Sequence, residues 1–286
     1  MNKALAALSL LLAAGSAPAQ EVVAVMSATP GPFQAACAAF SAALGRKTLQ
    51  LRAPVRTSAL ERARVVVAFG GDAALQPYPE RATLIATLAP GVAGRQEHPG
   101  PFVFVTMKPA PEALLGRLRE LQPGLKRLAV LTSSRDGERY VGDLRRAAAT
   151  LGLEIVVPKL AGADGVPDAL RALVDKADAL WLAPDPGLVT PDTFQTIRQF
   201  SWDHKVPFYA PTAGLAAAGA AAALAVDPED AGRQAADLAR RALDGEELPA
   251  YLYPDKVRLT VNLPSAAKAG LTPSGEALGK ADKVLR

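Results

Sequence analysis

Short apolar runs alternate with amphipathic stretches along most of the chain. The runs are nearly continuous in apolar residues, which is typical of parallel strands buried on both faces. The clearest lie at residues 21–26, 64–69, 82–86, 102–106, 128–131 and 179–182. The stretch 33–44 is helical in pattern, because its large apolar residues recur at spacings of four, three and four. This alternation predicts a doubly wound α/β fold, with parallel sheets covered by helices.

A break near residues 108–125 divides this pattern in two. Prolines and a glycine interrupt it at Pro109, Pro111, Pro123 and Gly124. A separate series of strands and helices lies on either side. Two lobes of comparable size therefore explain the pattern better than one very large sheet.

Several prolines mark the expected helix starts. Thr190-Pro191, Asp227-Pro228 and Thr272-Pro273 each place a capping side chain directly before a proline. A proline at the first helical position loses no hydrogen bond, because that amide has no partner within the helix. We expect helices over 191–204, 228–243 and 273–285.

The amino terminus has the three parts of a secretory signal peptide. Lys3 supplies a positive charge, residues 4–14 are apolar, and Ala17-Pro18-Ala19 is a small-x-small cleavage site. The apolar stretch is shorter than the roughly 20 residues that cross a bilayer. We expect residues 1–19 to be removed and the mature chain to begin near Gln20 in the periplasm. A short membrane anchor is the alternative.

Composition removes several classes of protein. The chain has 286 residues, half of them hydrophobic, and a formal net charge of +4, which is typical of a folded protein. A single cysteine, Cys37, excludes an intrachain disulfide and fits a small buried position. The basic residues are scattered among acids and aromatic residues make up only 5%, which disfavours nucleic-acid binding.

Enzyme motifs are missing. The only histidines are His98, in a turn, and His204, at a predicted helix end. The sequence contains no nucleophile elbow, zinc-binding histidine pair, paired-cysteine motif or phosphate-binding loop. We expect no catalytic residue, no metal and no cofactor. An enzyme that uses scattered carboxylates stays open.

Polar residues follow several of the predicted strands, where ligands of α/β sheets bind. Backbone amides and hydroxyls at helix starts suit an anion such as a carboxylate. Arg135 can add a bidentate contact to it, and Asp72 and Asp185 can each face an amine. The candidate ligand-binding residues are Ser27, Thr29, Gly71, Asp72, Ser133, Ser134, Arg135, Asp185, Thr212 and Ala213.

Each charged candidate also has a structural interpretation. Asp72 can be a helix cap. Asp185 can belong to a simple turn with Pro186, and Arg135 to a surface bend. Tyr140 and Trp181 are candidates to line a cleft, although a tryptophan on a strand more often lies in the core.

The second half of the chain resembles a known family. The stretches that carry the resemblance are 179–185 (ALWLAPD), 214–226, 230–236 (DAGRQAA), 257–263 (VRLTVNL) and 281–284 (ADKV). They are similar to the ABC-transporter substrate-binding family that includes aromatic amino-acid binders. The resemblance is good from about Leu125 onward and weak before it. Two loops of this chain differ from the family. Residues 27–33 lack the histidine and the Leu-Asp pair that members often carry after the first strand. The polar tip beyond the second strand is changed to Gly71-Asp72.

The resemblance implies a type I periplasmic binding protein fold, with two doubly wound parallel-sheet lobes joined by crossover segments. It implies that the chain returns to the first lobe near 219–245 and that Asp185 faces the ligand. The expected first lobe comprises residues 20–108 and about 219–248, and the expected second lobe 109–218 and about 249–263. Residues 264–286 are expected to form a C-terminal helical tail.

These observations favour an exported, monomeric solute-binding protein. We expect it to close two lobes on a small polar solute, either amino acid-like or a small carboxylate, and to deliver it to an inner-membrane ABC permease. A ligand-sensing module for a membrane receptor is the alternative. A two-lobe α/β enzyme, such as a glycosyltransferase, is a weaker one.

Overall fold

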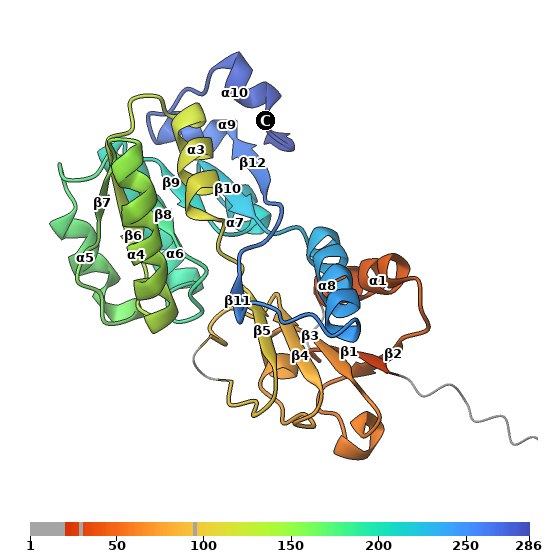
Figure 1. The fold of residues 1–286 in the computed structure, drawn as a ribbon. Helices are drawn as coiled ribbons and strands as arrows, with labels where there is room; N and C mark the ends of the chain where they lie inside the picture. The colour runs from red at the N-terminus through yellow and green to blue at the C-terminus, as the bar shows by residue number, and fades with distance from the viewer. Residues whose placement is uncertain (1–20, 29–30, 94–95) are drawn as a thin grey trace, which may run out of the picture.

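The computed structural model describes residues 21–28, 31–93 and 96–286 and shows two α/β lobes (Figure 1). The expected signal peptide and Thr29 lie outside the described residues. Each lobe is built on its own sheet, with helices on both faces. The predicted fold class is therefore confirmed.

The first lobe is built on a parallel sheet of the order β11-β5-β4-β3-β1-β2. The strands are β1 (Val22–Met26), β2 (Leu49–Arg52), β3 (Val65–Phe69), β4 (Thr83–Thr87), β5 (Phe102–Val105) and β11 (Tyr251–Leu252). Every residue of β1 and β3 is buried, because helices cover both faces there.

Helices α1 (Phe33–Leu44) and α8 (Pro228–Leu243) cover one face of this sheet and lie side by side in Figure 1. The short α2 (Gly71–Ala74) and the 3₁₀ turn η1 (Thr57–Leu60) contribute to the core on the other face. Cys37 is buried between α1 and the sheet, as expected, and burial raises its pKa to about 11.

The second lobe is built on the sheet β13-β12-β10-β9-β8-β6-β7, which is parallel except for the antiparallel pair β10–β12. The strands are β6 (Arg127–Leu131), β7 (Glu154–Val156), β8 (Ala179–Leu182), β9 (Phe208–Ala210), β10 (Ala222–Ala225), β12 (Arg258–Asn262) and β13 (Lys283–Leu285). Trp181 on the central strand β8 is fully buried in the core rather than in a cleft.

Two helical layers enclose this second sheet. One layer consists of α3 (Pro111–Leu121), α4 (Arg135–Thr150), α9 (Leu263–Lys268) and α10 (Gly275–Gly279). The other consists of η2 (Ala163–Gly165), α5 (Val166–Ala172), α6 (Pro191–His204) and α7 (Ala213–Ala217).

Two of the three predicted helix starts are confirmed. Thr190 forms a capping box with Thr193 at the start of α6, and Asp227 accepts two backbone amides at the start of α8. The third prediction is wrong by two residues, because Ser274 rather than Thr272 caps α10.

The structure moves the expected lobe boundaries. The sequence predicts residues 219–248 in the first lobe, but β10 within this range pairs with β9 and β12 in the second sheet. It predicts residues 249–263 in the second lobe, but β11 within this range pairs with β5 in the first sheet. The chain therefore crosses between the lobes at residues 106–110, 226–227 and 253–257. The boundaries were predicted wrongly because a run of apolar residues indicates a strand but does not specify which of the two sheets that strand joins.

The prediction of a purely helical C-terminal tail is also wrong, because the tail includes a strand of the second sheet. Within 264–286, α9 and α10 are short, and β13 adds a parallel edge strand to β12 through Val284 and its neighbours. Three residues are too few for a recognisable period, so only the pairing with β12 reveals the strand.

Gly232 permits the close approach of α8 to α1. A Cβ added at Gly232 would lie 2.1 Å from the carbonyl oxygen of Ala36 and 2.9 Å from the backbone nitrogen of Phe40. Small buried residues on α8, such as Ala235, continue this contact. The family-like stretch 230–236 therefore has a packing role in the first lobe.

We expect Gly232→Ala to lower the free energy of unfolding by about 1–3 kcal/mol, since the added methyl group overpacks against backbone that cannot move independently. In Gly116→Ala the added Cβ meets no atom within 4 Å. That variant should be up to about 1 kcal/mol more stable, because alanine is the better helix former. Urea denaturation measures both changes, and equal effects would contradict the close approach.

Candidate ligand-binding site

The loops that follow the strands of the two lobes meet across the space between them. Gly91, after β4, has a φ of +76°, and a Cβ there would lie 3.2 Å from the Cγ of Pro186, after β8. A glycine at this position therefore lets the lobes touch. The contact marks one point where the strand ends of both lobes come together.

The first-lobe candidates have different positions. Ser27 is buried, and its hydroxyl accepts the amide hydrogen of Ala73 at 3.1 Å. Gly70 has a φ of +97°, and a Cβ there would lie 2.5 Å from the Ser27 Oγ. Ser27 therefore holds the loop between β3 and α2. Gly71 is the first residue of α2, and Asp72 is exposed in its first turn.

Asp185 is buried and organises the loops of the second lobe. Its Oδ2 accepts the amides of Ser133 at 2.7 Å and Ser134 at 3.0 Å, and also the hydroxyls of Thr132 and Ser133. Its Oδ1 accepts the amide of Gly187 at 3.0 Å. These protein donors occupy the carboxylate that was expected to face a ligand amine.

These contacts also determine the charge of Asp185. Burial raises the pKa of its carboxyl, but hydrogen bonds from the amides of Ser133 and Gly187, and from the two hydroxyls, outweigh that effect. The pKa therefore lies below its ordinary value, and Asp185 is ionised in the folded protein at neutral pH.

The other second-lobe candidates divide into two groups. Thr212 caps α7 by accepting the amide of Leu215 at 3.3 Å, and Ala213 is exposed at the start of that helix. Ser134 caps α4 by accepting the amide of Gly137 at 3.1 Å. Arg135, the first residue of α4, is exposed and lines a pocket between the lobes.

This interlobe pocket has a volume of about 300 Å³. The first lobe contributes Ala93, Phe102, Phe104, Ala250 and Tyr251, and the second contributes Arg135, Asp136 and Arg139. Of the predicted site residues the structure describes, Arg135 alone lies there. The sequence analysis did not group the aromatic residues Phe102, Phe104 and Tyr251. They lie on β5 and β11, which are far apart in the chain and come together only by pairing in the sheet.

A row of aromatic rings extends from this pocket into the second lobe. Ring centroids are 5.8 Å apart for Phe104 and Tyr251, 5.7 Å for Tyr251 and Tyr253, and 6.2 Å for Tyr253 and Tyr140. Tyr140 is buried and donates a hydrogen bond to the carbonyl oxygen of Pro109 at 2.8 Å. It therefore supports a crossover segment instead of lining the cleft.

A buried ion pair lies next to this row. Lys108, in the first crossover segment, pairs with Asp136 of α4, and both residues are buried. Tyr251 donates a hydrogen bond to the Oδ1 of Asp136 at 3.2 Å. The pair and the tyrosine therefore connect a crossover segment, the second lobe and the edge strand of the first.

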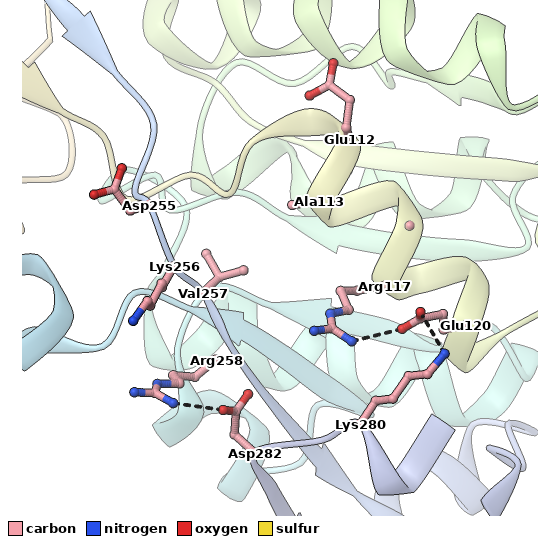
Figure 2. A pocket seen from close by; sticks show the side chains of 11 residues that line it. Glu112, Ala113, Arg117, Glu120, Asp255, Lys256, Val257, Arg258, Lys280 and Asp282 are labelled. Atoms are coloured by element: carbon pink, nitrogen blue, oxygen red, sulfur yellow. Dashed lines mark hydrogen bonds and ion pairs between the residues drawn. The ribbon is translucent and has the colours of Figure 1, made fainter. Parts of the chain in front are cut away.

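A second hollow, of about 640 Å³, lies on the second lobe near α3 and β12 (Figure 2). Its charged residues are largely paired with one another. Arg117 and Lys280 each lie 3.1 Å from the carboxylate of Glu120, and Arg258 lies 3.1 Å from Asp282. Because these charges neutralise one another, the hollow offers less to a charged ligand than the interlobe pocket does.

The described residues contain no group of three or more side chains arranged to hold a metal ion. None of the helices in that same part of the chain is long and apolar enough to cross a membrane.

Comparison with known proteins decides the family. The ABC transporter substrate binding protein family matches residues 114–285. The chain belongs to this family. As a substrate-binding protein of an ABC transporter family, it has a binding function rather than an enzymatic one. No curated protein matches the chain.

Solved structures share the fold of this substrate-binding protein. An ABC domain from Streptococcus pneumoniae in complex with L-Trp is 16% identical, with a TM-score of 0.64, over 93% of this chain and 100% of that one. A ligand-free, open substrate binding protein with adhesive properties from Clostridium difficile is 16% identical, with a TM-score of 0.66, over 93% and 99%. A periplasmic ribose ABC transporter protein from Conexibacter woesei is 16% identical, with a TM-score of 0.52, over 87% and 94%.

We expect Asp185→Asn to lower the free energy of unfolding by about 2–3 kcal/mol at pH 7, because charge-assisted hydrogen bonds to buried amides are lost. The folded pKa of Asp185 is depressed, so its contribution is present above the unfolded value of about 3.9 and is lost as pH falls through the folded pKa. Urea denaturation between pH 7 and pH 3 should therefore show the two proteins converging in acid.

Asp168→Asn is the matched control, since Asp168 is exposed and pairs only with the exposed Arg171 among the residues described. Its effect should stay below about 1 kcal/mol. If Asp185→Asn left the stability unchanged but abolished ligand binding, the structural role would be contradicted and Asp185 would instead contact the ligand directly.

Proposed function

We propose that this substrate-binding protein is a periplasmic carrier that closes its two lobes on a small polar solute and delivers it to an inner-membrane ABC permease. The observation that carries this proposal is the interlobe pocket, whose walls come from β5 and β11 of one lobe and α4 of the other. A ligand that contacts both walls stabilises the closed arrangement, and closure is the signal that a permease recognises.

The candidate residues have two roles in this proposal. Arg135 contacts the solute directly from the second lobe. Asp72 and Ala213 are exposed at the strand ends, where they can approach a solute as the lobes close. Ser27 and Asp185 hold the surrounding loops in place through their hydrogen bonds. We propose that the carrier is a monomer, since one chain supplies both walls of the pocket and binding therefore needs no second copy.

Export is the second part of the proposal. Its support is the charged, apolar and small-residue order of residues 1–19. Osmotic shock should release the protein from a Gram-negative host, and amino-terminal sequencing should find a chain that begins near Gln20. Recovery of the intact amino terminus in the membrane fraction would support an anchor and contradict cleavage.

Closure is tested with purified protein and a panel of amino acids, small carboxylates, nucleosides and sugars. A true ligand at about 100 times its Kd stabilises the folded state by about 2.7 kcal/mol, which should raise the Tm by roughly 5 °C. Small-angle X-ray scattering should then show a smaller radius of gyration. A ligand that raises the Tm without compaction would contradict closure, and the absence of any ligand would contradict the proposed function.

A further inference from the structure

The interlobe pocket has an unbalanced charge. Asp136 is its only acidic lining residue, and the buried ammonium of Lys108 already neutralises that carboxylate. In the described part of the chain, neither Arg135 nor Arg139 forms an ion pair. Residues 1–20, 29–30 and 94–95, which lie outside the described part, contain no Asp or Glu that could pair with them. The two guanidinium groups therefore leave the pocket with an excess of positive charge.

The position of Arg139 is fixed by an aromatic ring. Its guanidinium carbon lies 4.3 Å from the centroid of the Tyr251 ring, a cation–π contact across the two lobes. A stacked guanidinium keeps its N–H groups free at the edge, where they can bind a carboxylate in a bidentate manner. Arg135 lies one helical turn earlier on α4, so both groups can reach one anion.

The remaining walls of the pocket are apolar. Phe102 and Phe104 lie on one face of β5, with ring centroids 6.4 Å apart, and Tyr251 packs beside them. The Tyr251 hydroxyl is already used as a donor to Asp136. A sugar with many hydroxyl groups would therefore find few partners here, whereas an apolar ring would find continuous contact.

An amine would also lack a partner. Asp185 does not line the pocket, and the carboxylate of Asp136 is paired with Lys108. Asp72 is exposed on α2 and does not line the pocket. A zwitterionic amino acid would therefore bring a positive charge next to two guanidinium groups, with no unpaired acid among the residues that line the pocket.

The size of the pocket is consistent with a small ring. A volume of about 300 Å³ lies at the lower end of the range for ligand sites, roughly 300–1,000 Å³. An apolar cavity of about 150 Å³ already admits benzene. A benzene-sized ring and one carboxylate therefore fit with the lobes in this arrangement.

We propose that the solute is a monocarboxylate with an apolar, ring-sized body and no amine, bound by Arg135 and Arg139 and packed on Phe102, Phe104 and Tyr251. The inference rests on the proposed function, because it names the substrate class of the same interlobe site.

The test uses isothermal titration calorimetry of the mature chain with benzoate, phenylacetate and 3-phenylpropionate. Their matched neutral and zwitterionic probes are benzamide and L-phenylalanine, and D-ribose represents the sugars. At least one carboxylate should bind at least tenfold more tightly than every neutral or zwitterionic probe. Arg135→Gln and Arg139→Gln should each weaken its binding by roughly 10- to 100-fold, the range expected for lost hydrogen bonds to a charged group.

Arg145→Gln is the matched control, since Arg145 is an exposed arginine on α4 that does not line the interlobe pocket. It should bind the carboxylate as the unmodified protein does, and circular dichroism should show all three variants folded. Tighter binding of L-phenylalanine or ribose, with compaction, would overturn the substrate class and leave the proposed function intact. Carboxylate binding that both Arg→Gln variants retain would overturn the assigned site. Failure of every probe and of the wider solute panel would overturn both proposals.

Discussion

The buried pair of Lys108 and Asp136 is the constraint on which the arrangement of the lobes depends. Both groups are removed from water, so each needs the other, and removal of one partner from such a pair costs about 3–5 kcal/mol. Lys108 lies on the first crossover segment, Asp136 lies in the first turn of α4, and Tyr251 reaches Asp136 from the first lobe. The ion pair therefore joins the crossover segment to α4, and the hydrogen bond from Tyr251 links both to the edge strand of the first lobe.

The same pair determines the chemistry of the pocket beside it. Because Lys108 neutralises Asp136, the positive charges of Arg135 and Arg139 are not compensated by the acid that lines the pocket with them. The aromatic row that begins at Phe104 continues through Tyr251 and Tyr253 to Tyr140, so the pocket and the crossover segments share one packed unit. A ligand in the pocket therefore contacts the residues that connect the lobes.

Asp185 shows how burial changes the interpretation of an acid. In the sequence it is a polar residue after an apolar strand, and the family resemblance implies that it faces the ligand. In the structure its two oxygens accept amides and hydroxyls from four residues of the loops around it, Thr132, Ser133, Ser134 and Gly187. A carboxylate with this many internal donors stabilises the loops around it.

The sequence alone determined the alternation of strands and helices, the capped starts of α6 and α8, the buried Cys37, and the family of the second half. These features depend on neighbours within a few residues, so local pattern contains them. The tertiary structure decided which sheet β10, β11 and β13 join, and it brought Tyr251 to Arg139 and Lys108 to Asp136. Those contacts join segments far apart in the chain, and hydrophobic periodicity carries no information about which distant segment a strand or a charge will meet.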